Sequence, residues 1–431
     1  MNIVKKWILG NEETAGRNGA LWNMIASILY SLQSAILLLV ITRATGLVDG
    51  GIFTIAYTVT QMMATIGSFG MREFQASDAK QEYKFETYFS SRIVSVLAMV
   101  VICMGYSVIR GYTGEKLILI AILCLYRLIE DVEDVIHGEM QRSLRFDIAA
   151  KIMTTRIFTA TVLFIVAYII FKNLTVACAT LTVSAALVSI CFNSQAIKLF
   201  ATIKLKLIKE KLIKLLWVCL PICVGGFLYN YLVNAPKYAI DRNLSEETQS
   251  IFNILFMPIF AINMFSMFVF KPMVAKMGVV WTNGESGKFL KMVLKQTAVI
   301  VGITVALMGL GAAVGTQVLG LIYGVELVQY RLFFTLLIMF GGFAAFVAFY
   351  VVVLTIMRKQ MFVVVAYLAG TVIELLLVDK VVIAKGLDGA GIMYGVGILA
   401  VLVVLLLVFV ISILMAKKRH DKGVTKVGLD I

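Results

Sequence analysis

The stretch VGILAVLVVLLLVFVISILM, from Val396 to Met415, contains no charged residue and is followed closely by Lys417, Lys418 and Arg419. An apolar run of about 20 residues is what an α-helix needs to cross the hydrocarbon core of a bilayer. Basic residues directly after such a run are typical of a cytoplasmic end. This stretch therefore predicts a membrane-spanning helix, and similar runs along the whole chain predict a polytopic membrane protein.

The composition agrees with that prediction. Of 431 residues, 61% are hydrophobic and 15% charged, and the mean hydropathy is +0.94. Soluble domains are roughly half apolar and about a quarter charged, so a soluble globular protein and a disordered chain are excluded. The six cysteines all fall in apolar runs and only two histidines are present, so we expect no disulfide framework, metal or other cofactor.

We expect an all-α protein with about twelve transmembrane helices. With the N-terminus inside, the predicted cytoplasmic segments hold 27 of the 39 Lys and Arg residues and the external segments hold 9. This bias places both termini in the cytoplasm and explains the net charge of +14 without nucleic acid as a partner. The predicted spans are 19–41, 51–70, 88–109, 116–139, 151–171, 174–196, 215–236, 249–270, 291–316, 331–355, 361–379 and 389–415.

A basic stretch, Lys198–Lys214, interrupts the pattern halfway, with six lysines among Leu and Ile residues. It is typical of a positive-inside signal lying on anionic headgroups, and a regulatory or partner-binding helix is the alternative. We predict a six-helix lobe over 1–197, a linker over 198–214, a second six-helix lobe over 215–416 and a basic tail over 417–431. Two lobes of this kind are an architecture found in secondary transporters.

Polar side chains line one face of three predicted spans, where hydrocarbon would make them costly. Such stripes favour a hydrated cavity between the lobes, although ordinary hydrogen bonds between helices are the alternative. Arg72 joins the second stripe if that helix continues without a break. The candidate residues are Asn23, Ser27, Tyr30 and Ser34 on the first span, Thr54, Thr58, Gln61, Thr65 and Ser68 on the second, and Asn230, Asn234, Lys237 and Asp241 on the seventh.

The span over 116–139 carries Arg127, Glu130, Asp131 and Asp134 within about 100° of helical arc. One interpretation is a carboxylate cluster that takes up a proton or Na⁺, with Arg127 as its counter-ion. The alternative is a helix whose charged end protrudes into the cytoplasm. Separately, Glu374 is a lone carboxylate within the span 361–379, and we predict an ion-coupling role for it against a structural hydrogen bond.

Several motifs of other protein classes are missing from the sequence. It contains no phosphate-binding P-loop, so ATP is not the direct energy source of this chain, and no Cys–His or Ser–His pair suited to nucleophilic catalysis. We therefore predict that the protein is not an enzyme. Two pairs, Gly311 with Gly315 and Gly391 with Gly395, have the spacing that lets membrane helices approach closely.

Three strings resemble bacterial polysaccharide-repeat-unit flippases (Wzx-type) of the multidrug/oligosaccharidyl-lipid/polysaccharide exporter superfamily. They are GMREFQASD at 70–78, GEMQRSLRFD at 138–147 and NAPKYAI at 234–240. The resemblance implies two six-helix lobes around a central cavity and an undecaprenyl-diphosphate-linked oligosaccharide as substrate. Arginine and lysine bind phosphate oxygens, so the candidate diphosphate ligands are Arg43, Arg72, Lys237 and Arg242.

The predicted function is therefore to flip this lipid-linked oligosaccharide, by alternating access, from the inner to the outer leaflet of a bacterial cytoplasmic membrane during surface polysaccharide assembly. The expected partners are that substrate, membrane lipids and a polysaccharide polymerase. One alternative is an ion-coupled multidrug exporter of the same superfamily, which should present mainly carboxylates to its cavity. Another is a polytopic polysaccharide polymerase, which should need a larger external loop than this chain has.

Overall fold

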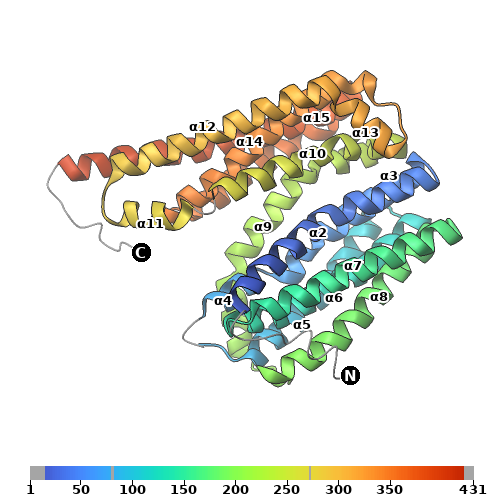
Figure 1. The fold of residues 1–431 in the computed structure, drawn as a ribbon, viewed down its shortest axis with the longest axis horizontal. Coiled ribbons are helices and arrows are strands. Elements are labelled where there is room, and N and C mark those ends of the chain that lie inside the picture. The colour runs from blue at the N-terminus through green and yellow to red at the C-terminus, as the bar shows by residue number, and fades with distance from the viewer. Residues whose placement is uncertain (1–14, 79–81, 271–272, 422–431) are drawn as a thin grey trace. The chain divides into compact units, whose positions relative to one another are not determined.

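The computed structural model describes residues 15–78, 82–270 and 273–421, and within these ranges the chain is helical and contains no β-strand (Figure 1). The predicted all-α class is confirmed. Each predicted span corresponds to a long helix, except that the last two share one. The long helices are α2 (Ala15–Ala44), α3 (Leu47–Ser68), α5 (Phe85–Ile109), α6 (Gly114–Arg142), α7 (Phe146–Phe171), α8 (Leu174–Ala196), α9 (Lys209–Asn243), α10 (Glu246–Phe270), α12 (Ser286–Leu310), α14 (Arg331–Ile356) and α15 (Met361–Asp421).

Eight helices in the described part of the chain are long and apolar enough to cross a membrane, and α15 counts once among them although it contains two predicted spans. The helices α3, α6 and α10 fall outside this group, α6 because charged residues interrupt every window of sufficient length. The chain is thus a multi-pass membrane protein, as predicted. In lipid only helices or closed barrels satisfy every backbone hydrogen bond, which explains the absence of other secondary structure in these ranges.

The chain divides into two compact units, unit 1 over residues 1–230 and unit 2 over residues 231–431, with the boundary inside α9. Before α9, the basic stretch forms a 3-10 turn at Ile197–Leu199 and then a non-helical segment at 201–208. Of the predicted basic tail, residues 422–431 lie outside the described ranges.

Unit 1 is built around α6 and α7. The helix α7 packs against α2 and α8, and α6 packs against α3, α5 and α8 (Figure 1). At one end of these helices, buried side chains from six segments form a continuous apolar core that includes Met71, Tyr88, Ile136, Ile148 and Leu215. Burial of this kind contributes about 25 cal/mol per Å² of apolar surface where water is the alternative solvent.

The second predicted span does not continue as one helix to Arg72. The helix α3 ends at Ser68, because Phe69 and Gly70 adopt left-handed backbone conformations with φ of 50° and 64°. A new short helix, α4 (Met71–Ser77), then begins in another direction. A Cβ atom on Gly70 would lie 2.5 Å from Ile222, so the turn needs glycine both for its φ angle and for space.

Unit 2 is organised by α14, which packs against α10, α12 and α15. The two glycine pairs predicted to allow close helix approach receive large side chains of α14. Gly311 and Gly315, in a π-helical turn, lie against Ile338 and Phe334, whereas Gly391 and Gly395 on α15 lie against Phe333 and Phe340. The prediction from the glycine spacing is confirmed, with bulky side chains filling the space that the glycines leave.

The helix α15 is a hairpin of two antiparallel halves. Gly386 has φ 57° and ψ −133°, which interrupts the helix and reverses the chain. After the reversal, Gly389 lies against Val381, and Gly397 lies against Glu374. The paired residues lie further apart in the sequence the further they are from Gly386. The two predicted spans therefore run side by side in opposite directions.

Candidate functional site

The charged face of α6 is buried inside unit 1 and does not protrude into solvent. Arg127 is 1% exposed, and Asp131, Glu133 and His137 are also buried, whereas Glu130 and Asp134 are partly buried. The interpretation of α6 as a helix with a solvated cytoplasmic end is therefore wrong. The face is buried because α3, α5, α7 and α8 surround it. The periodicity of the sequence did not reveal these neighbours.

Two arginines hold the first part of this face. Arg127 forms an ion pair with Glu130, one turn further along α6, and its guanidinium lies 4.4 Å from the centre of the Tyr57 ring. From α7, Arg156 reaches both Glu130, at 3.1 Å, and Glu133, at 2.5 Å. Because buried charges are costly unless paired, this arrangement stabilises the contact between α6 and α7.

Two further arginines hold the next turn of α6. The carboxylate of Asp134 accepts hydrogen bonds from Arg72 of α4, at 2.8 Å, and from Arg92 of α5, at 3.0 Å. Arg92 is fully buried and also donates a 2.7 Å hydrogen bond to the carbonyl of Gly67. Asp134 thereby connects three helices, α4, α5 and α6.

The buried face is balanced in formal charge. We refer to it as the arginine–carboxylate network. One oxygen of Asp131 is buried without a hydrogen-bond partner among the described residues, and it lies against Gly67. Glu133, in turn, lies 3.3 Å from the Nε2 atom of His137. The network comprises Arg72, Arg92, Arg127 and Arg156 against Glu130, Asp131, Glu133 and Asp134.

Sequence reasoning identified Arg72, Arg127, Glu130 and Asp134 but missed Arg92 and Arg156. Both missed arginines lie within predicted spans, and a charged residue at that depth is itself a signal for a buried partner. Their positions on α5 and α7 could have been matched to the carboxylates of α6 only with knowledge of how these helices are rotated. The network thus includes partners on helices that carried no polar stripe in the sequence.

Two of the strings that resemble polysaccharide flippases contact each other beside this network. Gln75 of the first string donates a 3.1 Å hydrogen bond to Glu139 of the second, and Arg72 donates one of 3.4 Å to Gln141. The close approach depends on Gly138, where a Cβ atom would collide with Gln75. These strings therefore form one structural contact between α4 and the end of α6.

The first string ends at Asp78, which organises the connection from α4 to α5. Its carboxylate accepts hydrogen bonds from the backbone N–H groups of Glu82 and Tyr83, at 2.9 and 3.1 Å, and from the Tyr88 hydroxyl at 3.0 Å. Burial alone would raise the pKa of Asp78, but these hydrogen bonds outweigh it and lower that pKa below its usual value.

In unit 2, Glu374 of α15 is fully buried. Neither of its carboxylate oxygens has a hydrogen-bond partner among the described residues. Gly397, on the other half of α15, makes room for this side chain, because a Cβ atom there would lie 2.5 Å from one carboxylate oxygen. Glu374 therefore differs from Glu130 and Asp134 of unit 1, which arginines hold on both sides.

Lys237 of α9 is also buried, and its ammonium nitrogen lies 4.8 Å from the centre of the Phe256 ring. Phe256 packs in turn against Tyr394, with 4.8 Å between ring centres. A cation over an aromatic face is attracted by the ring quadrupole, more strongly when both are removed from water. This cation–π contact holds the ammonium group of Lys237 beside the aromatic residues of unit 2.

The remaining predicted residues are dispersed. Arg242 donates a 2.7 Å hydrogen bond to Asp379, so it already holds a carboxylate. Asn230 donates to the carbonyl of Gly226 in its own helix, at 3.1 Å, and Asn234 is buried. Arg43 is exposed in the last turn of α2, and Asn23 and Gln61 are partly buried on α2 and α3. The predicted substrate-binding residues thus belong to both units and form no single cluster within either.

No protein-family model and no curated protein matches this chain, but solved structures do. One is an inward-facing multidrug resistance transporter of the MATE family in the MOP superfamily, with TM-score 0.66 and 16% identity over 92% of this chain and 99% of that one. An outward-facing member has TM-score 0.59 and 15% identity, with 95% and 98% covered. A third is a MOP superfamily transporter from Pyrococcus furiosus, described by a reverse polarity of its binding pocket that suggests a different function, with TM-score 0.56 and 13% identity, 96% and 97% covered.

This likeness extends over nearly the whole chain and shows that the protein has the fold of MATE transporters. The predicted all-helical, two-lobe fold agrees with these structures. The identities are too low to carry a substrate from those proteins to this one.

Proposed function

We propose that this protein is an ion-coupled exporter that works by alternating access and that Glu374 binds the coupling cation. The observation that carries this proposal is the burial of Glu374 without a hydrogen-bond partner for either oxygen among the described residues. A buried carboxylate without a hydrogen-bond partner is very costly, so we infer that it binds a proton or a metal cation there. Loading and release of that cation would couple the ion gradient to transport.

The carboxylates of unit 1 suit this role less well. Glu130 contacts Arg127 and Arg156, and Asp134 contacts Arg72 and Arg92, so both carboxylates already have full positive compensation. A carboxylate in that setting gains little from a proton or Na⁺. We infer that Arg127, Glu130 and Asp134 hold unit 1 together.

For the substrate, we propose an anionic lipid-linked oligosaccharide, as in the polysaccharide flippases that the sequence resembles, exported across a bacterial cytoplasmic membrane. Lys237 supports this class, because a buried cation favours a phosphate-bearing ligand. Arg72 holds the carboxylate of Asp134, and Arg242 holds that of Asp379. The rival class, a lipophilic cation, is supported by the multidrug transporters among the structural neighbours.

Glu374→Gln tests the coupling. The amide has the shape of the protonated carboxyl group but cannot bind and release a cation. In proteoliposomes with an imposed pH or Na⁺ gradient, we expect the variant to insert normally and to lose gradient-driven transport. Transport with an unchanged gradient dependence would contradict the role of Glu374.

The substrate class is tested separately in cells that lack their own exporter. Expression of the protein should restore surface polysaccharide, and Lys237→Gln should abolish that export at normal protein abundance. Resistance to lipophilic cationic dyes, without any restored polysaccharide, would instead favour the multidrug class.

A further inference from the structure

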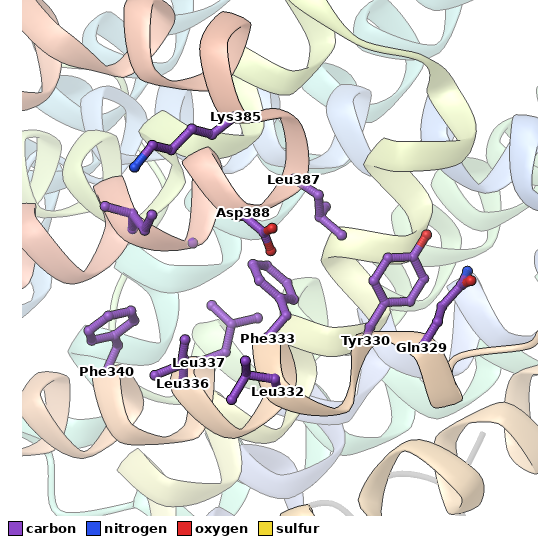
Figure 2. Close-up of a pocket in the computed structure, with 12 residues that line it drawn as sticks. Gln329, Tyr330, Leu332, Phe333, Leu336, Leu337, Phe340, Lys385, Leu387 and Asp388 are labelled. Atoms are coloured by element: carbon purple, nitrogen blue, oxygen red, sulfur yellow. The ribbon is translucent and has the colours of Figure 1, made fainter.

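Unit 2 contains a groove that the proposed transport function does not use. It has a volume of about 790 Å³ and lies between the start of α14 and the hairpin of α15 (Figure 2). Its walls are mainly apolar and include Leu332, Leu336 and Ile392. The volume falls within the roughly 300–1,000 Å³ of small-molecule sites.

The floor of the groove is built by two aromatic rings. Phe333 and Phe340 of α14 lie in it, each packed where α15 has a glycine. Phe340 occupies the space beside Gly395, where a Cβ atom would lie 2.5 Å from the ring, and Phe333 similarly occupies the space beside Gly391. Rigid aromatic floors of this kind provide apolar surface suited to a hydrocarbon chain.

Two charged side chains of α15 line the groove. Lys385 and Asp388 flank Gly386, where the two halves of α15 meet; the Lys385 ammonium points away from Tyr330, which lines the groove on the turn before α14 (Figure 2). Both charged side chains are exposed, and neither forms an ion pair with any residue that the structure describes. A positive and a negative group thus stand unpaired at the mouth of an apolar groove.

We propose that this groove binds a zwitterionic phospholipid with a primary ammonium headgroup, such as phosphatidylethanolamine. The lipid phosphate would accept a hydrogen bond from Lys385, and the lipid ammonium would donate to Asp388. An acyl chain would lie along Phe333 and Phe340. Tyrosine is enriched where a membrane protein meets the headgroup region, which suits Tyr330 at this level.

The charge pattern selects against other membrane components. An anionic lipid would bring its phosphate beside Lys385 but would leave Asp388 opposed by negative charge. A lipophilic cation could pair with Asp388 but would bring its positive charge beside Lys385. Only a headgroup with both signs satisfies both residues, and complementarity of this kind gives specificity through the cost of the mismatched alternatives.

Lipid binding to the full-length protein tests the inference. The purified protein is stripped of lipid in detergent, and then phosphatidylethanolamine, phosphatidylcholine or phosphatidylglycerol is added at equal concentration. Bound lipids are counted by native mass spectrometry. We expect phosphatidylethanolamine to be retained best, because the quaternary ammonium of phosphatidylcholine cannot donate a hydrogen bond to Asp388.

Variants locate the site. Lys385→Gln and Asp388→Asn should each weaken phosphatidylethanolamine binding about tenfold, as expected for one hydrogen bond to a charged group. Lys380→Gln is the matched control, because Lys380 is exposed on the same helix but does not line the groove. Leu336→Trp should block binding by filling the groove while leaving the charges in place.

Three results would overturn the proposal. Equal retention of all three lipids would indicate an ordinary lipid annulus, and preference for phosphatidylglycerol would indicate an anion site. Unchanged phosphatidylethanolamine binding in Leu336→Trp would place the lipid elsewhere. Since none of these measurements involves transport, they are independent of the role proposed for Glu374.

Discussion

Removal of Arg156 should destabilise unit 1 more than any change to a surface ion pair. Its guanidinium lies 3.1 Å from Glu130 and 2.5 Å from Glu133, and the side chain is 3% exposed. Arg156→Leu fills the site with a large apolar side chain but leaves Glu133 without its arginine. Removal of one partner from a buried ion pair costs about 3–5 kcal/mol. At about 2–4 °C per kcal/mol for a unit of this size, the midpoint of thermal unfolding should fall by about 6–20 °C.

The assay is thermal unfolding of the purified protein in detergent, followed by the exposure of buried cysteines to a thiol-reactive dye. Five of the six cysteines are buried, and Cys191→Ser removes the exposed one from the background. Lys214→Ala is the control, because its ion pair with Glu82 is exposed and should contribute little to stability.

A second substitution tests the cause of the loss. Glu133→Gln in the Arg156→Leu background removes the uncompensated charge, so it should recover part of the lost stability, with a coupling of about 0.5–3 kcal/mol. If Arg156→Leu unfolds at the same temperature as the Lys214→Ala control, the arginine–carboxylate network is not what holds these helices together. An absence of recovery in the double variant would instead refute charge as the reason.

Two further changes test the surroundings of the network. Gly67→Ala should destabilise the protein by about 1–3 kcal/mol, because the new methyl group would overlap the Asp131 carboxylate and lie 2.8 Å from Met99. The control is Gly105→Ala, where the added Cβ atom meets open space. Equal midpoints of thermal unfolding in the two variants would contradict this prediction. Asp78 has a lowered pKa in the folded protein, so its stabilising contribution is present above the usual value of about 3.9 and is lost as the pH falls below it. Unfolding midpoints measured from pH 6 to pH 3 should therefore fall less steeply in Asp78→Asn than in the unaltered protein, and parallel curves would exclude this role.

Part of the candidate site could be predicted from the sequence because its residues are rare in their surroundings. A charged side chain in an apolar run is conspicuous, so Arg127, Glu130 and Glu374 were identified without a structure. The pattern did not reveal how these residues differ. Arginines from other helices surround Glu130, whereas Glu374 faces a glycine and has no hydrogen-bond partner among the described residues. This difference is the reason for assigning them different roles.

The end of α3 is another feature that the sequence did not predict. Hydropathy predicted the span to within a few residues, yet the expectation that Arg72 continues its polar face was wrong. Two left-handed residues, Phe69 and Gly70, end the helix, and Ile222 occupies the space in which a side chain at position 70 would lie. The preferences of the local residues cannot predict this turn, because Ile222 lies far from it along the chain.

The sequence by itself determined that this chain crosses a membrane many times as helices. Long uncharged runs have no other way to satisfy their backbone hydrogen bonds in lipid, and the distribution of Lys and Arg predicts their orientation. Only the tertiary structure decided which charges meet, because that depends on the rotation and depth of each helix against its neighbours. Arg92 and Arg156 come from helices without a polar stripe, and packing alone brings them to the carboxylates of α6.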